Sequence, residues 1–183
     1  DKRWKWHALP RTPLVLQRKD LVGTTLGEAQ AILARMEVDP QLQISVKEWT
    51  EIERRLARKG AMAFASSCAS CHGSSGSGLS GLGPSLIDSP WLLDEAQVPV
   101  RIVLDGLTGP IEVDGETWDL TMPGHRENPR LADEDIAGLL TWARRQWGHQ
   151  ADPISPQQVL TIREATRGRK LPWTIQSLQK GPF

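Results

Sequence analysis

The sequence predicts an all-α domain over residues 46–150, with an N-terminal extension (residues 1–45) and a basic C-terminal extension (residues 151–183). Two amphipathic helical patterns, and the Gly- and Pro-rich segments between them, lead to this prediction. The chain has 183 residues, of which 39% are hydrophobic and 24% are charged. That size and composition suit one globular domain with extensions.

The first predicted helix begins with Ser45-Val46-Lys47-Glu48, which has the form of a capping box. Trp49, Ile52 and Leu56 follow at helical spacing. Gly60 interrupts this pattern and would cost about 1 kcal/mol relative to alanine inside a helix. We therefore expect another helix to cross closely at Gly60.

A second helix is predicted over residues 133–147. Asp133 can cap it, and the acidic residues that follow suit the positive end of the helix dipole. Its apolar face comprises Ile136, Leu139, Leu140, Ala143 and Trp147. Gly148 is expected to end the helix. Trp142 lies beside the apolar face, and we expect it to pack on Gly60.

Shorter elements are predicted between these helices. Residues 94–105 favour a helix with Pro99 in its first turn or at a kink. Asp114-Gly115 lies between two short apolar-containing runs and predicts a hairpin. The Gly/Ser run 73–78 is typical of a flexible surface loop.

Both cysteines lie within one short motif, Cys68-Ala69-Ser70-Cys71, which His72 follows directly. Two cysteines exclude a disulfide framework and a four-cysteine zinc site. A redox motif would require a strand before Cys68, and zinc would require two further ligands, whereas the other histidines are scattered. These readings stay as alternatives. The spacing favours covalent haem attachment through two thioether bonds, with His72 as an iron ligand.

A haem iron held by His72 needs a second axial ligand or keeps an open site. Met36 and Met62 precede the motif, and Met62 lies within the helix that leads into it. Met122 lies in Thr121-Met122-Pro123-Gly124, which predicts a loop able to cover a haem face. We expect Met122 to be the ligand, with His125 or an open iron as the alternatives.

Haem propionates need hydrogen-bond donors. Arg101, Trp91 and Trp118 are the candidates, because a guanidinium or an indole N–H can donate to a carboxylate.

The order of these features resembles the class I cytochrome c family over roughly residues 46–150. The matching positions are Gly60, Phe64, Cys68, Cys71, His72, Gly83, Pro84, Met122 and Trp142. The resemblance implies that the first and last helices cross at a glycine–aromatic contact. It also implies that the Pro84 carbonyl accepts a hydrogen bond from His72. Covalent haem attachment, as the resemblance implies, means maturation outside the cytoplasm.

The C-terminal segment Arg167–Thr174 is similar to the appendage, ending in Pro-Trp-Thr, of cytochrome domains in bacterial multidomain haem proteins and dehydrogenases. Charge is uneven along the chain, with a net +4 over residues 1–60, −7 over residues 61–150 and +3 over residues 151–183. We expect the extensions to anchor the domain to a partner rather than to complete its core. Wrapping of the basic ends around the acidic domain is the competing account.

The predicted function is one-electron transfer by a single haem c in the periplasm or at the outer face of the cytoplasmic membrane. The expected partners are a protein electron donor and acceptor, and other subunits of an oxidoreductase or a respiratory or photosynthetic complex. No catalytic residues are predicted, so the chain is expected to be a carrier rather than an enzyme. A haem enzyme or a gas or peroxide sensor with an open iron is the alternative.

The remaining sequence features limit the other classes of function. Lys plus Arg and Asp plus Glu both number 22, which argues against a nucleic-acid partner. No apolar run of 18 residues occurs, so no transmembrane helix is predicted. Because the chain begins at Asp1 without an initiator Met or a signal peptide, we interpret it as mature or trimmed.

Overall fold

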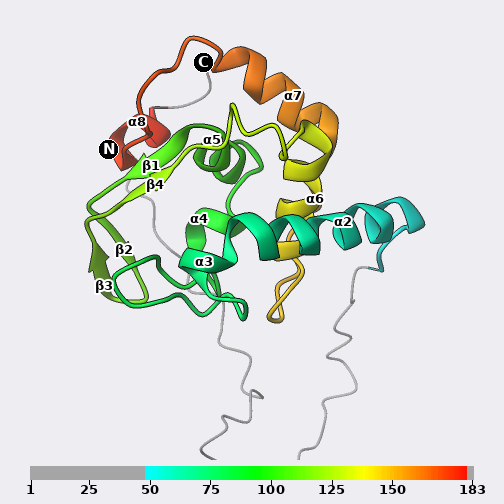
Figure 1. Cartoon of the computed structure of the whole chain (residues 1–183), viewed down its shortest axis with the longest axis horizontal. Helices are drawn as coiled ribbons and strands as arrows, with labels where there is room; N and C mark the ends of the chain where they lie inside the picture. Colours follow the sequence, from blue (N-terminus) through cyan, green and yellow to red (C-terminus); the bar gives the residue numbers. More distant parts are fainter. Residues whose placement is uncertain (1–47, 181–183) are drawn as a thin grey trace, which may run out of the picture. The chain divides into compact units, whose positions relative to one another are not determined.

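A computed structural model describes residues 48–180 (Figure 1). The predicted N-terminal extension, including its aromatic residues, lies outside the described residues, as do Ser45 and Phe183. Within the described range, no helix is long and apolar enough to cross a membrane.

The first described helix, α2 (Glu51–Ser67), begins later than the sequence pattern predicts. Residues 48–50 are not helical, and the capping box is formed by Thr50 and Glu53. The buried face also differs, because Ile52 is 72% exposed. The buried residues of α2 are instead Leu56, Ala57, Gly60 and Phe64, which recur at helical spacing.

Helix α2 crosses α6 (Asp133–Ala143) steeply, as Figure 1 shows. The close crossing at Gly60 is confirmed, but its partner is Gly138 rather than Trp142. A Cβ built on Gly60 would meet the backbone of Gly138 and lie 2.6 Å from Leu139 N. Trp142 instead packs against Phe64, with ring centroids 4.8 Å apart. Two glycines bring the backbones together, and the aromatic pair fills the space one turn away.

Helix α6 keeps the predicted apolar face, since Ile136, Leu139, Leu140 and Ala143 are all buried. Its ends differ from the prediction. The N-cap is Ala132, whose backbone N–H donates to Asp135 Oδ2 at 3.0 Å, so Asp133 is the first helical residue rather than the cap. The helix ends at Ala143, and Trp147 lies beyond it in the left-handed backbone region (φ 55°).

Between α2 and α6 the chain forms short helices and two small sheets. The helices are α3 (Ala69–His72), α4 (Pro90–Leu93) and α5 (Gln97–Asp105), with Pro99 in the first turn of α5 as predicted. The predicted hairpin is present as β2 (Ile111–Val113) and β3 (Glu116–Trp118), joined by Asp114-Gly115.

The second sheet was not predicted. Strand β1 (Gly106–Thr108) pairs antiparallel with β4 (Thr121–Pro123), so the segment around Met122 is a strand and not a loop. The fold is therefore a helical domain with two small antiparallel sheets, and "all-α" describes only its helical frame.

The Gly/Ser run after His72 is held more firmly than its composition suggests. Gly78 N–H donates to His72 O at 2.8 Å, and Leu86 N–H donates to Gly76 O at 2.8 Å. Gly76 is buried against the Trp147 ring, so a side chain there would clash. The serines are exposed, but the glycines belong to the folded domain.

The C-terminal segment also belongs to the folded domain. Helix α7 (Pro156–Ala165) buries Val159 and Ile162 in the main core. Trp173 and Leu178, the latter on α8 (Ile175–Gln179), join the second apolar cluster beside β1 and β2. The expectation that this extension does not complete the core is therefore wrong. The boundary at residues 150 and 151 stays a prediction.

Candidate functional site

The Cys-x-x-Cys-His motif lies at the junction of α2 and α3. Cys68 ends α2, and Cys71 and His72 lie on the single turn of α3. This turn places the three side chains on one wall of an apolar cavity, which all three line. Cys68 and His72 are buried, and Cys71 is half-buried.

His72 is oriented by the turn at Gly83-Pro84, as the family resemblance implied. Its Nδ1–H donates to Pro84 O at 2.8 Å. Burial lowers the pKa of His72, and this hydrogen bond opposes that effect in part. The ring is therefore neutral with its proton on Nδ1, which leaves the Nε2 lone pair available to a metal.

The Cys68 thiol is harder to deprotonate than the thiol of a reactive cysteine. Burial, followed by the neighbouring Cys71, raises the pKa of Cys68 to about 12. Redox cysteines and zinc-bound cysteines act as thiolates. The environment of Cys68 disfavours the thiolate that a redox cysteine needs. Among residues 48–180, no group of three or more His, Cys, Asp or Glu side chains is placed to hold a metal ion such as zinc.

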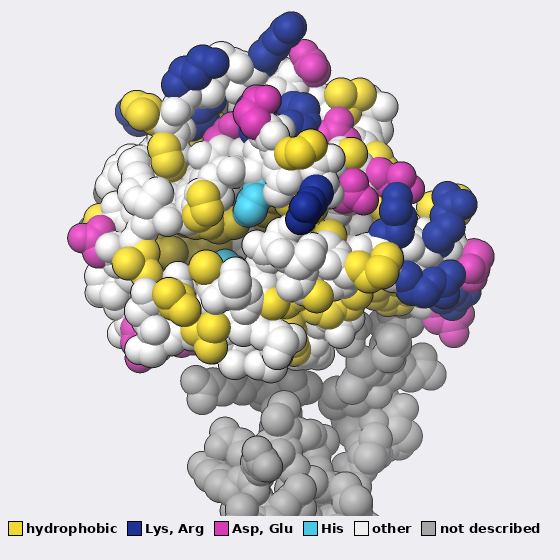
Figure 2. All heavy atoms as spheres, in the orientation of Figure 1, with side chains coloured by type: hydrophobic (Ala, Val, Ile, Leu, Met, Phe, Trp, Pro, Cys, Tyr) yellow, Lys and Arg dark blue, Asp and Glu magenta, His cyan; other side chains and the backbone are white. Residues whose placement is uncertain are grey.

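The cavity, together with the solvent-open space at its mouth, has a volume of about 1090 Å³ and is lined mainly by apolar side chains. Its walls come from α2, α3, α5, α6 and both sheets, and include Phe64, Leu86, Val103, Ile111, Val113 and Leu140. Figure 2 shows it as a hollow between hydrophobic side chains on the viewed face. It is large enough and apolar enough for a planar macrocycle.

Met122 lines the same cavity from strand β4. It pairs with Leu107 of β1, and it is half-buried. The cavity thus brings together the Cys-x-x-Cys-His motif and a thioether that lies 50 residues further along the chain. His125, the rival ligand, is not among the residues that line the cavity. It is half-buried, and that burial lowers its pKa.

The three propionate candidates lie in different places. Trp91 and Trp118 both line the cavity. The Trp91 Nε1–H is buried and has no acceptor among the described residues. Arg101 does not line the cavity, and its guanidinium lies 5.0 Å from the centre of the Trp173 ring.

These features together fit haem c. Two cysteines, a methionine and a histidine whose Nδ1–H is already bonded to Pro84 O line one apolar cavity. Cys-x-x-Cys-His is the motif through which c-type haem is attached.

Sequence reasoning missed the part of the wall that the sheets provide. Leu107, Ile111 and Val113 line the cavity. The alternation of Ile111 and Val113 about exposed Glu112 has the period of a strand with one buried face, and it could have indicated this wall. Leu107 has no such signal, because β1 is only three residues long.

Comparison with known proteins agrees with this geometry. Residues 55–142 match the family described as cytochrome c oxidase, cbb3-type, subunit III. The chain is also similar to the gluconate 2-dehydrogenase cytochrome c subunit of Pantoea cypripedii, with 32% identity over 111 residues. That alignment covers 59% of this chain but only 24% of the relative, so the chain spans about a quarter of that protein. The domain that contains Cys68, Cys71 and His72 is therefore a class I c-type cytochrome domain, which carries covalently bound haem c.

Proposed function

We propose that this chain is an electron-transfer subunit of a larger oxidoreductase and works outside the cytoplasm. One observation supports this above all, namely that Cys68, Cys71, His72 and Met122 line a single apolar cavity. When bound, haem c supplies an iron that accepts and releases one electron. The relative from Pantoea cypripedii, named as the cytochrome c subunit of a dehydrogenase, supports the role as a subunit.

In this proposal each side chain has a distinct task. Cys68 and Cys71 would hold the haem through two thioether bonds, and His72 Nε2 and Met122 Sδ would hold its iron. The hydrogen bond from His72 Nδ1–H to Pro84 O fixes the ring and makes Nε2 a stronger donor to the iron. A soft thioether ligand favours Fe(II) and so raises the reduction potential.

The propionates are held by donors at the cavity wall. Trp91 is the first candidate, because its buried Nε1–H lacks an acceptor among the described residues. Trp118 is the second, since it also lines the cavity. That Arg101 donates to a propionate stays a prediction, and the position of its guanidinium over the Trp173 ring does not favour it.

Electron exchange needs a place where the cofactor edge reaches a protein partner. Leu82 and Leu120 line the cavity and are also 57% and 43% exposed. Exposed leucines at the rim of a cavity form an apolar contact surface that a partner can cover. We assign the docking of the electron donor and acceptor to this rim. The chain is a carrier in this proposal, and we assign it no catalytic residue.

The test uses the haem-loaded chain. Haem that stays with the protein in acidified acetone would support thioether attachment, and Cys68→Ala with Cys71→Ala should abolish it. Met122→Ala should remove the weak far-red absorption band of Met–Fe(III) ligation and lower the potential. Met62→Ala is the matched control, because Met62 is 69% exposed and does not line the cavity.

The outcome also separates the electron carrier from a haem enzyme or sensor. A wild-type protein without the far-red band would have an open or differently ligated iron, and it would contradict the assignment of Met122. Co-purification of the native protein with dehydrogenase subunits tests the proposed assembly. A native protein that purifies as a free monomer would contradict it.

A further inference from the structure

Met122 lies on a very small sheet. Strands β1 and β4 share three residue pairs, Gly106 with Pro123, Leu107 with Met122, and Thr108 with Thr121. A two-stranded sheet of this length is marginal by itself. The position of Met122 therefore depends on the contacts that hold β1 and β4 together.

One end of this sheet is closed by a bidentate ion pair. Asp105 directly precedes β1, and Arg126 follows β4 by three residues. Arg126 Nε lies 2.7 Å from Asp105 Oδ1, and Arg126 Nη2 lies 3.1 Å from Asp105 Oδ2. The two side chains are 15% and 5% exposed, so water screens the pair little. Two backbone bonds, from His125 N–H to Val103 O and from Arg126 N–H to Leu104 O, reinforce it.

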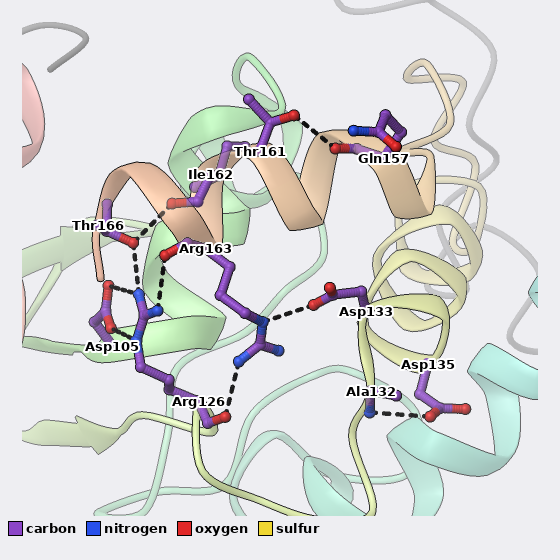
Figure 3. Close-up of polar contacts among 10 residues, drawn as sticks. All are labelled: Asp105, Arg126, Ala132, Asp133, Asp135, Gln157, Thr161, Ile162, Arg163 and Thr166. Carbon is purple, nitrogen blue, oxygen red and sulfur yellow. Dashed lines mark hydrogen bonds and ion pairs between the residues drawn. The ribbon is translucent and has the colours of Figure 1, made fainter.

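The same arginine joins the sheet to the C-terminal helix α7, as Figure 3 shows. Arg126 Nη1 donates to Arg163 O at 2.9 Å, and Arg163 Nη1 donates to Arg126 O at 2.8 Å. Arg163 Nε also pairs with Asp133 Oδ1 of α6 at 2.7 Å. Arg126 donates in addition to Thr166 Oγ1. The segment after Met122 is therefore tied to two helices.

The other edge of β1 is covered by Trp173. Trp173 N–H donates to Gly106 O at 2.9 Å, and Thr108 N–H donates to Trp173 O at 2.8 Å. The indole Nε1–H also donates to Asp105 Oδ2 at 3.3 Å. Asp105 thus accepts hydrogen bonds from both Arg126 and Trp173. The C-terminal segment forms a single parallel bridge with β1, between Trp173 and Leu107.

We infer that Asp105, Arg126 and Trp173 are positioning residues that hold Met122 in the haem cavity. This inference rests on the proposed function, in which Met122 is the axial ligand. Methionine has three rotatable side-chain bonds, so its backbone must be held if the sulfur is to stay on a metal. Because the C-terminal segment supplies Trp173 and Arg163, it contributes to ligation by a residue on another element.

The experiment measures Met122 ligation and global stability separately in the haem-loaded full chain. Arg126→Met removes the guanidinium and leaves the buried Asp105 carboxylate with the Trp173 Nε1–H donor but without its bidentate ion pair. As the pH is raised, the far-red band should be lost at a midpoint about one unit lower than in the wild type. A shift of one unit corresponds to a tenfold change toward the state without Met122 on the iron. The reduction potential should fall as well.

Arg167→Met is the matched control. The Arg167 side chain is 83% exposed, and it forms a 3.9 Å ion pair with Glu164, three residues earlier in the chain. The same substitution there should leave the band, its pH midpoint and the potential at wild-type values. Arg126→Lys keeps the charge but loses the bidentate geometry, so it should restore the midpoint in part.

Trp173→Phe keeps the test decisive if Arg126→Met does not fold. Phenylalanine keeps an aromatic ring, although a smaller one, and the backbone bonds, but it lacks the Nε1–H donor to Asp105. It should lower the pH midpoint of the band in the same direction by a smaller amount. Amide hydrogen exchange should also be faster over residues 120–126, while residues 133–143 stay protected.

Two results would overturn the inference in different ways. If Arg126→Met and Trp173→Phe lower the melting temperature but leave the band midpoint and the potential at the values of Arg167→Met, the three residues have only a structural role. If the wild type lacks the band, or Met122→Ala keeps it, the proposed function itself fails and this inference fails with it.

Discussion

Gly60 of α2 and Gly138 of α6 meet backbone to backbone, and neither position has room for a side chain. A Cβ built on Gly138 would lie 2.6 Å from Leu56 O, and one built on Gly60 would lie 2.6 Å from Leu139 N. The contact sets the distance between the two helices that frame the haem cavity, since α2 leads into the Cys68 motif and α6 supplies Leu139, Leu140 and Ala143 to the cavity wall.

Gly60→Val should therefore destabilise the domain, although helix propensity alone favours valine slightly. We expect a loss of about 1–3 kcal/mol in the free energy of unfolding, because backbone atoms cannot move aside as a side chain can. Denaturant unfolding would measure it. Ala65→Val is the control, since Ala65 is exposed on the same helix. Equal stability of the two variants would contradict the close crossing.

Removal of residues 151–183 should unfold or strongly destabilise the domain. Val159, Ile162, Trp173 and Leu178 are buried, and each fully buried large apolar side chain contributes about 1.5–3 kcal/mol. Thermal melting of residues 46–150 against residues 46–183 would test this. A truncated domain that melts at the same temperature would restore the view that the segment is only an anchor.

Trp91→Phe should change the titration of a haem propionate. The Trp91 Nε1–H is buried and has no acceptor among the described residues, so a propionate that accepts from it would be stabilised in its charged form. Loss of the donor should raise the pKa of that propionate, seen as a shift to higher pH in the pH dependence of the reduction potential. Trp118→Phe is the comparison. An unchanged pH dependence in both variants would exclude the tryptophans as propionate donors.

His125 should make the domain less stable in mild acid. Burial lowers its pKa, so below about pH 6.5 the unfolded chain binds a proton that the folded domain resists. Stability should therefore fall as the pH drops from about 7 through the ordinary histidine pKa toward the lowered value of the folded state. His125→Asn should weaken this slope in melting temperatures measured against pH. A slope equal to that of the wild type would show that His125 does not contribute.

The sequence by itself determined the chemistry of the site. Cys68, Cys71 and His72 are neighbours in the chain, and their spacing is a local property that predicts haem attachment in any fold that buries them. The Asp114-Gly115 hairpin and the start of α5 around Pro99 were predicted for the same reason, because a turn or a first helical turn depends on a few adjacent residues.

Only the tertiary structure decided which distant residues meet. Gly138 rather than Trp142 faces Gly60, since the contact depends on how two helices cross and not on either helix alone. Met122 lies on a strand because Leu107 pairs with it, and a three-residue strand has no periodicity to detect. Trp173 belongs to the basic C-terminal extension, yet it is buried beside β1. Burial is a property of the assembled core, which brings residue 173 to residues 106–108 through contacts that no local pattern contains.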